Sequence, residues 1–442
     1  MYFLHLLLPL FTLFNHNYAY IFPKPISRKI EIKNLEEESR EILQKINGFY
    51  GLIGPDLERK KIKSIFDLLM GNGIIQGVFI ENGELTFVKN EIKTDKRNLE
   101  TFQLPKYSSK KIFMNIMGVA NTAFLQWNNK TYALFERDQP YEININRVEK
   151  RIETIGKCNI PDLAHFSAHP KIKGMYLETI DYDVFRKKTT IFQLDNDFRI
   201  LSSMEIPMKH FPIIHDFIST RDSVVFLNSA FMWNISILPR FSGKFQLDTN
   251  KPATFFLMDR NTGKINRYYT ESGIYIFHYA DFYETDTDLE IYAPVYESLD
   301  FSTLILKGKY RKITLDKKTN KIHMEKNMEL EKWNVDFPVA FFHENKKKIL
   351  LRYVDTEQHT GFVICDKLNI EKVICFPGKC ICGEPSIIEI DGTAYAIFFT
   401  IDNYENGYFT LLNIITEKKI EISLYINLQI GFHALYTPIN NT

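Results

Sequence analysis

FPIIHDFISTRDSVVFLNSAF, residues 211–231, joins a histidine, a turn and an apolar strand in one short stretch. His215 and Asp216 come first, the Ser-Thr-Arg-Asp-Ser segment has the composition of a turn, and VVFL has that of a buried strand. A single histidine beside an aspartate is more often structural than functional. A functional role for His215 therefore requires partner histidines in similar settings elsewhere in the chain.

The rest of the chain repeats this alternation of short apolar runs and turns. Runs such as GIIQGVFI, KTYALFE and TAYAIFFTI have the composition of strands, and helical periodicity is rare after residue 70. Before that point, residues 30–46 predict one short amphipathic helix with Asn34 as its cap. The turn sequences between strand-like runs predict hairpins; they are Glu81–Glu84, Asn128–Lys130, Asp195–Asp197, Asn261–Lys264, Asp391–Thr393 and Glu405–Gly407.

Such a series of hairpins predicts an all-β protein, with one domain over residues 30–442. Propellers, large sandwiches and jelly rolls can each hold this many antiparallel strands, and no WD or kelch-type repeat selects among them. The 36 Phe and 23 Tyr residues suit an aromatic β core or the lining of an apolar cavity. The lysine-rich stretch 307–332 is expected to be a solvated outer hairpin.

Charge and cysteine content exclude several classes of protein. The 55 basic and 54 acidic residues give a net charge of +1, so no electrostatic footprint for nucleic acid is present. The five cysteines do not have the spacing of a paired zinc site. Four of them cluster, and they are expected to be free thiols or to form one local disulfide; they are Cys365, Cys375, Cys380 and Cys382.

The N-terminal stretch MYFLHLLLPLFTLFNHNYAY, residues 1–20, is apolar but short for a bilayer span. It predicts a signal peptide or a membrane-proximal leader, although no basic residue precedes it. Sequons at Asn129, Asn234 and Asn440 are compatible with the secretory pathway or secretion. If the leader is not a signal peptide, the protein is expected in the cytoplasm.

Four histidines lie where a strand-like run meets a turn: His169 in FSAHPKI, His215, His278 in IFHYADFYE and His433 in IGFHALY. They are 46, 63 and 155 residues apart, so only a closed fold such as a propeller could bring them together. Four imidazoles without a thiolate suit iron, and an octahedral metal would keep open positions. The other histidines are expected to be core, surface or leader residues; they are His5, His16, His165, His210, His323, His343 and His359.

The words around these histidines resemble those of the carotenoid cleavage oxygenases, a family that includes retinoid isomerohydrolases, apocarotenoid oxygenases and lignostilbene dioxygenases. FERDQPYE, FSAHPKI, IIHDF, IFHYADFYE, CGEP and GFH occur in the family's order between about Gly48 and Pro438. The resemblance implies a seven-bladed β-propeller, capped by loops and short helices over a substrate tunnel. It also implies Fe(2+) on the propeller axis, held by His169, His215, His278 and His433.

The resemblance further implies three carboxylates that accept N–H bonds from the ligand histidines and fix their orientation. It assigns Glu136 and Glu384 to this role, and Asp336 in Val335-Asp336-Phe337-Pro338 stands where the family has glutamate. Because its side chain is one methylene shorter, Asp336 is expected to need a backbone shift or a bridging water. Asp216 is expected to face away from the metal and to serve the turn.

The implied activity is that of an iron(II)-dependent dioxygenase that cleaves a C=C bond of a carotenoid or apocarotenoid to carbonyl products. Its partners would be an apolar polyene, dioxygen and a membrane surface. Stilbene-cleaving members have a lysine where this chain has Phe135, which favours a polyene over a stilbene and predicts that Phe135 lines the cleft. Eroded N-terminal family words leave alternatives: a silent propeller that holds metal and an apolar ligand, a stilbene-cleaving dioxygenase, or a hydrolase with another metal.

Overall fold

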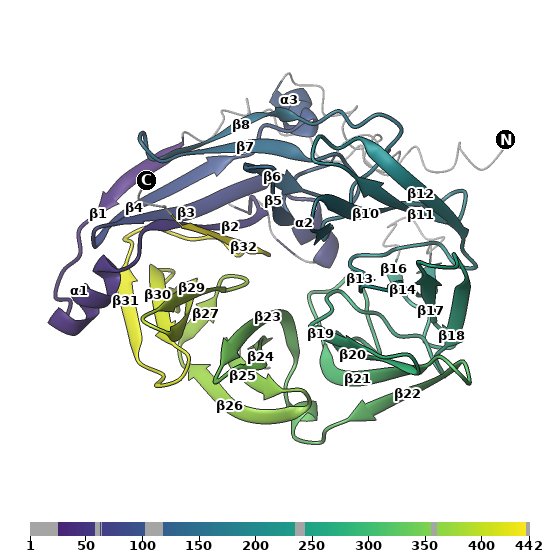
Figure 1. Ribbon diagram of the computed structural model, residues 1–442. Coiled ribbons are helices and arrows are strands. Elements are labelled where there is room, and N and C mark those ends of the chain that lie inside the picture. The colour runs from purple at the N-terminus through teal and green to yellow at the C-terminus, as the bar shows by residue number, and fades with distance from the viewer. Residues whose placement is uncertain are drawn as a thin grey trace.

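A computed structural model of the protein describes residues 25–57, 62, 64–101, 118–234, 244–354 and 360–438. In these residues, seven antiparallel sheets of four or five strands stand like blades around a central axis (Figure 1). A separate two-stranded sheet consists of β15 (Phe231–Asn234) and β16 (Lys244–Leu247). The prediction of an all-β, seven-bladed propeller is confirmed. The predicted leader and the sequon at Asn440 lie outside the described residues.

Successive stretches of the chain form successive blades. Blade 1 is closed by both ends of the chain and consists of β32 (Ala434–Pro438), β2 (Gly48–Pro55), β3 (Gly73–Glu81), β4 (Glu84–Glu91) and β1 (Ile26–Ile30). Blade 2 consists of β5 (Ala123–Trp127), β6 (Lys130–Leu134), β7 (Tyr141–Asn146) and β8 (Arg151–Lys157). Blade 3 consists of β9 (Lys171–Lys173), β10 (Tyr176–Asp183), β11 (Lys188–Leu194) and β12 (Ile200–Pro207). Blade 4 consists of β13 (Ile218–Ser219), β14 (Ser223–Asn228), β17 (Thr254–Asp259) and β18 (Ile265–Tyr269). Blade 5 consists of β19 (Asp281–Glu284), β20 (Asp288–Val295), β21 (Lys309–Asp316) and β22 (Lys321–Lys326). Blade 6 consists of β23 (Val335–His343), β24 (Lys346–Val354), β25 (Thr360–Asp366) and β26 (Asn369–Phe376). Blade 7 consists of β27 (Lys379–Ile381), β28 (Ser386–Ile390), β29 (Thr393–Asp402), β30 (Gly407–Asn413) and β31 (Lys419–Ser423).

The ring is closed by hydrogen bonds between the two ends of the chain. β2 pairs with β32 from Gly48 opposite Pro438 to Leu52 opposite Ala434. Closure of this kind leaves no blade interface open at the point where the chain begins and ends. Apolar side chains fill the space between neighbouring blades; Leu289 and Ile291 of blade 5, for example, pack with Ile218 and Val225 of blade 4.

The predicted turns connect strands in all six places. Asn82 and Gly83 between β3 and β4 both have positive φ, as do Asn128 and Asn129 between β5 and β6. Two left-handed residues in a row match the right-handed twist of the flanking strands, and asparagine and glycine tolerate that conformation best. These residues therefore fixed the hairpins that the sequence predicted.

The predicted helix over residues 30–46 is wrong in extent. Residues 26–30 instead form β1 at the outer edge of blade 1, where Ile30 lies opposite Leu85. Asn34 has a φ of 53° and turns the chain, so it does not cap a helix. The helix α1 covers only Glu37–Gln44, and its cap residue Glu36 makes no side-chain bond.

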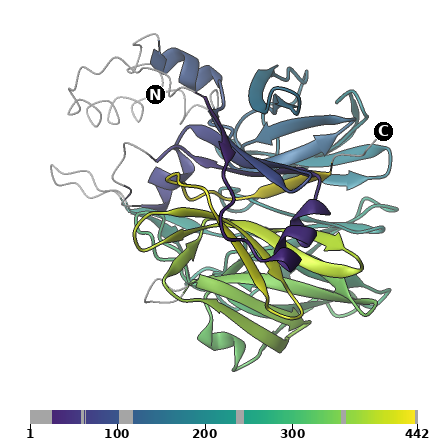
Figure 2. The ribbon, with the colours of Figure 1, turned by 90° about the vertical axis from the view of Figure 1, so that its left-hand side faces the viewer.

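One face of the ring carries two of the short helices, α2 and α3, and we call it the cap face. The innermost strands of the blades all begin at this face, so the β2–β3, β14–β17 and β20–β21 connections lie there too. These connections contain α2 (Ile65–Leu69), the β15–β16 hairpin and residues 296–308. α3 (Asp95–Thr101) follows β4 at the same face, and Figure 2 shows α2 and α3 together on its left-hand side. A 3₁₀ turn, Leu330–Lys332, precedes β23. Within the described residues, no helix has the length and apolar character to span a membrane.

Candidate metal centre

The propeller brings His169, His215, His278 and His433 together at the cap-face end of the axis. Each precedes the innermost strand of its blade, which is β9, β13, β19 or β32. Their ligand atoms all lie within 4.8 Å of one another. The Nε2 atoms of His169 and His215 are 3.1 Å apart, those of His215 and His278 are 3.2 Å apart, and those of His278 and His433 are 3.1 Å apart.

The four imidazoles point to one centre from different directions. Their ring planes are inclined to each other by between 60° and 86°. Metal–nitrogen bonds of about 2.1 Å at right angles would separate neighbouring nitrogens by about 3 Å. The observed Nε2 separations therefore match the ligand shell of a metal ion.

Three carboxylates bind the outward-facing nitrogens of three of these rings. His215 Nδ1 donates to Glu136, His278 Nδ1 lies 2.6 Å from Asp336 Oδ1, and His433 Nδ1 lies 3.2 Å from Glu384 Oε2. Because a carboxylate only accepts, each Nδ1 carries the proton, and the Nε2 lone pair of a neutral ring faces the centre. Lone pairs that converge in this way repel one another unless a cation lies between them, so the donor set fits a metal.

Asp336 reaches its histidine directly, and no bridging water is needed. The pairing of β23 with β24 shifts register between Asp336 and Val339, and Phe337 has a φ of 52°. A bulge of this kind re-aims the side chain beside it. The Phe337 N–H also donates to Asp336 Oδ1 over 2.8 Å, which fixes the carboxylate from its own backbone. Asp336 thus reaches His278 from an irregular stretch of backbone, and whether its shorter side chain requires that irregularity stays a prediction.

Burial and the neighbouring charges set the protonation states. Burial, followed by the other imidazoles, holds the pKa of His169 well below its ordinary value. Burial also lowers the pKa of His433, against the opposing effect of Glu384. Burial alone would raise the pKa of the Asp336 carboxyl, but His278, Tyr296 and the Phe337 N–H together lower it by more. Glu136 behaves in the same way beside His215. Both carboxyls are therefore ionised and can orient their histidines.

Asp216 faces away from the metal centre, as predicted, and links three blades. It accepts hydrogen bonds from the backbone N–H of Phe217 at 2.7 Å and of Tyr279 at 3.1 Å. Lys171 of blade 3 forms an ion pair with it at 2.6 Å. Asp216 therefore stabilises the loop that carries His215.

The remaining candidate residues lie outside the cluster. His165 is buried and its Nδ1 lies 2.8 Å from Asp181, so it is a core histidine. His323 is exposed, while His210 and His343 are half-buried; His359 lies outside the described residues. Phe135 is half-buried directly beside Glu136, and its predicted place in the cleft stays a prediction. All five cysteines are free thiols.

An aromatic cluster that the sequence did not locate lies next to the centre. The ring of Phe277 is 5.4 Å from that of His215, 4.9 Å from that of Tyr275 and 5.1 Å from that of Tyr296. Phe231, Phe245 and Phe301 continue the cluster toward α2. Part of the high Phe and Tyr content thus provides an apolar surface beside His215 and His278, where an electrostatic contact is stronger than in water.

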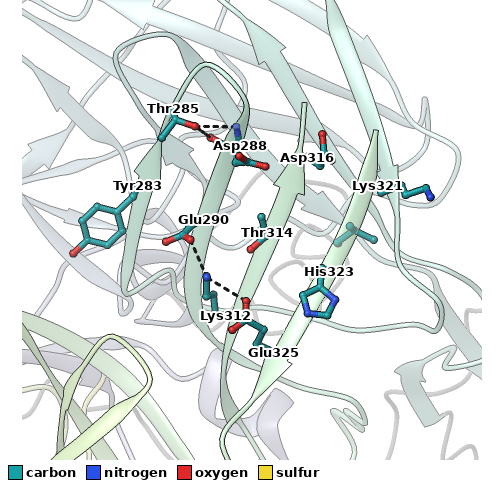
Figure 3. A pocket seen from close by; sticks show the side chains of 11 residues that line it. Tyr283, Thr285, Asp288, Glu290, Lys312, Thr314, Asp316, Lys321, His323 and Glu325 are labelled. Atoms are coloured by element: carbon teal, nitrogen blue, oxygen red, sulfur yellow. Dashed lines mark hydrogen bonds and ion pairs between the residues drawn. The ribbon is translucent and has the colours of Figure 1, made fainter. Parts of the chain in front are cut away.

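A hollow that includes none of the four histidines lies on blade 5 and is lined by residues of all four of its strands. Figure 3 shows Tyr283, Glu290, Lys312 and Glu325 on its wall, and Lys312 pairs with Glu290 at 2.8 Å and with Glu325 at 3.1 Å. Lys312 thus pairs with one carboxylate on each of its two neighbouring strands. The lysine-rich stretch 307–332 contains the outer hairpin β21–β22, as predicted, but only β22 and the turn are solvated, because β21 alternates between buried and half-buried residues.

Fold and site together define a β-propeller with four histidines at its axis, three of them paired with carboxylates, in an arrangement that fits a metal ion. The chain belongs to the retinal pigment epithelial membrane protein family, whose sequence pattern it matches over residues 28–438. This match confirms the family resemblance read from the histidine words.

Several characterised proteins are similar to the chain. Carotenoid 9,10(9′,10′)-cleavage dioxygenase 1 of Pisum sativum is 24% identical over 275 residues, which cover 55% of this chain and 50% of the pea protein. Apocarotenoid-15,15′-oxygenase of Synechocystis is 27% identical over 205 residues, or 42% of this chain and 40% of that protein. The matched part thus spans about half the length of these relatives or less. The structure of cobalt-substituted Synechocystis ACO superposes with a TM-score of 0.74 at 18% identity and covers 94% of this chain and 97% of that one.

Proposed function

We propose that the protein is an iron(II)-dependent dioxygenase that cleaves a C=C double bond of a carotenoid or apocarotenoid to two carbonyl products. The observation that carries the proposal is the convergence of four histidine Nε2 atoms at separations of 3.1 and 3.2 Å. The names of the relatives, which are carotenoid and apocarotenoid cleavage enzymes, support the same reaction class.

Each part of the site has a distinct task in this reaction. His169, His215, His278 and His433 would hold the iron, which supplies the activation of dioxygen. Glu136, Asp336 and Glu384 orient three of these rings and hold the ring proton on Nδ1, which leaves Nε2 to face the metal. The apolar wall around Phe277 excludes water and offers an aromatic surface to a conjugated chain. The phenyl ring of Phe135 suits a polyene better than a phenolic stilbene.

The activity can be tested with iron-loaded protein and an apocarotenal. Purified protein, loaded with Fe(2+) under nitrogen and then exposed to air, is expected to contain about one iron per chain and to form aldehyde products. Mass spectrometry identifies the products, and ¹⁸O₂ labels the new carbonyl oxygens. Protein kept under nitrogen is the control. Iron-loaded protein that binds the apocarotenal but yields no aldehyde in air would contradict the proposal and favour a silent propeller.

We also propose that the cap face rests on a membrane, from which an apolar polyene can enter. Phe66 of α2 and Leu304, Ile305 and Leu306 of the β20–β21 connection are 38%, 48%, 63% and 40% exposed. They lie together, because the N–H of Ile65 donates to Thr303 O over 2.8 Å and the Phe66 ring packs against Phe301. Exposed apolar groups gathered in this way mark interaction surfaces.

Replacing Leu304 and Ile305 with aspartate is expected to reduce binding to phosphatidylcholine vesicles by about tenfold or more, since insertion of each side chain contributes about 1.5–3 kcal/mol. Co-sedimentation with the vesicles measures the change. Val148→Asp is the matched control, because Val148 is 92% exposed but lies in the β7–β8 turn on the opposite face. Unchanged binding of the double variant, or equal loss in the control, would contradict membrane contact through this face.

A further inference from the structure

Two tyrosines bind the carboxylates behind the metal centre, and the sequence analysis assigned neither. The Tyr182 hydroxyl donates to Glu136 Oε2 over 2.9 Å. The Tyr296 hydroxyl donates to Asp336 Oδ2. In each carboxylate the other oxygen accepts the histidine N–H, so imidazole, carboxylate and phenol form a continuous chain. The same arrangement occurs twice, with Tyr182 on β10 of blade 3 and Tyr296 directly after β20 of blade 5.

The phenols satisfy anions that are otherwise enclosed by apolar groups. A buried carboxylate oxygen without a donor is strongly unfavourable, and a phenol supplies a donor without adding a charge to the site. Tyr182 is 5% exposed and Tyr296 is 1% exposed. Burial, followed by the adjacent carboxylate, raises the pKa of both phenols well above the ordinary value, so both stay protonated and donate.

The backbone holds both tyrosines in place. Tyr296 exchanges two backbone hydrogen bonds with Tyr275, at 2.8 and 2.9 Å. Tyr182 lies within the β10–β11 ladder opposite Thr189, and the Arg137 guanidinium covers its ring at 4.7 Å. Because the phenols are fixed, each one restricts rotation of its carboxylate and, through it, of the imidazole. The effect should be largest at Asp336, whose shorter side chain reaches His278 from a bulge.

The third carboxylate is fixed in a different way. Glu384 Oε2 accepts a hydrogen bond of 3.1 Å from the backbone N–H of Ala434, which is the residue after His433. A backbone N–H of β32 therefore holds the Glu384 carboxylate, whereas a tyrosine hydroxyl holds each of the Glu136 and Asp336 carboxylates. This difference limits the role of the tyrosines to His215 and His278.

We propose that Tyr182 and Tyr296 are positioning residues of the metal centre, which act through Glu136 and Asp336 to hold His215 and His278 in the orientation that a divalent metal requires. This inference rests on the metal-binding part of the proposed function. It does not depend on the substrate or on the reaction.

The test is the affinity of metal-free protein for Co(2+), measured by competition with a chelator and by the visible absorption of the bound ion. Tyr182→Phe and Tyr296→Phe are each expected to weaken binding by about tenfold, the lower end of the range for outer partners of metal ligands. The band of the bound cobalt is expected to shift, which a general loss of stability would not produce. Tyr310→Phe is the control, because Tyr310 is fully buried on blade 5 and its hydroxyl has no hydrogen-bond partner among the described residues.

A double-mutant cycle separates positioning from simple packing. In an Asp336→Ala background, Tyr296→Phe is expected to cause no further loss of cobalt affinity, since the carboxylate through which it acts is gone. Tyrosine variants that bind like Tyr310→Phe, or a Tyr296→Phe loss that persists without Asp336, would overturn the inference while leaving the metal site intact. Failure of the wild-type protein to bind Co(2+) would overturn the metal site itself, and with it both proposals.

Discussion

Replacing His215 with alanine is expected to lower the affinity of the protein for a divalent metal by more than about a hundredfold, because even outer partners of metal ligands contribute ten- to hundredfold. The change removes one of the four Nε2 atoms, which lies 3.1 Å from Nε2 of His169 and 3.2 Å from Nε2 of His278. It also leaves Glu136 without the N–H that His215 donates. Elemental analysis after anaerobic loading and dialysis measures the loss, and product formation from an apocarotenal is expected to fall with it.

His165→Ala is the matched control for this loss. His165 is also a buried histidine bound to a carboxylate, Asp181, but it lies outside the group of four. Its variant is expected to retain about one metal per chain. The far-ultraviolet circular dichroism of both variants should keep the β signal, since His215 lies in a loop before β13 and not within a strand. A His215→Ala protein that keeps its metal would show that the four histidines are not the ligands.

Local sequence predicted the all-β class, whereas the seven-bladed propeller and the four histidines followed from the resemblance of the words around those histidines to a known family. Asn-Gly and Asp-Gly turns have few alternatives to a hairpin. Each histidine stands at the start of an innermost strand, where a closed ring brings together residues as distant in the sequence as His169 and His433. Asp216 could be placed as well, because the residue after a ligand on an extended backbone points the other way.

The outer parts of the site could not be predicted, because they depend on contacts between distant blades. No sequence motif distinguishes Tyr182 or Tyr296 from the other tyrosines among the 23. They are 46 and 40 positions away from their carboxylates in the sequence, and only the closed propeller brings them into contact. The contact of Asp336 with His278 is made from a β-bulge, and the local sequence does not predict that bulge. Asn34 has the type of a helix cap, but edge pairing of β1 with β4 determined where the chain turns.

An ion pair between blades 3 and 4 leads to a second large expected effect, on stability. Glu178 on β10 is fully buried, and Arg260 in the β17–β18 turn binds both of its oxygens, one at 2.8 Å. Ser219 on β13 donates to the same carboxylate at 2.6 Å. Removing one partner of such a pair leaves a buried charge uncompensated, whereas removing both partners does not.

Arg260→Met is therefore expected to lower the free energy of unfolding by about 3–5 kcal/mol at neutral pH. Urea unfolding of the metal-free proteins measures the change. The double variant Arg260→Met with Glu178→Met is expected to recover much of this loss, since neither member of the pair then stays buried without its partner. Arg186→Met is the exposed control, because Arg186 lies 3.8 Å from Asp183 with a side chain 75% exposed, and it is expected to change stability by less than about 1 kcal/mol.

The pH dependence distinguishes an uncompensated charge from lost packing. In the wild-type protein, burial raises the pKa of Glu178, but Arg260 and Ser219 lower it by more, so the pair stabilises the fold above the unfolded pKa and loses this effect as pH falls through the lower folded value. In Arg260→Met, burial is opposed mainly by Ser219, so the folded pKa lies higher. Protonation of Glu178 then relieves the penalty as pH falls through that higher value. The stability difference between the two proteins must shrink on acidification, and a difference that stays constant with pH would assign the loss to packing of the arginine stem.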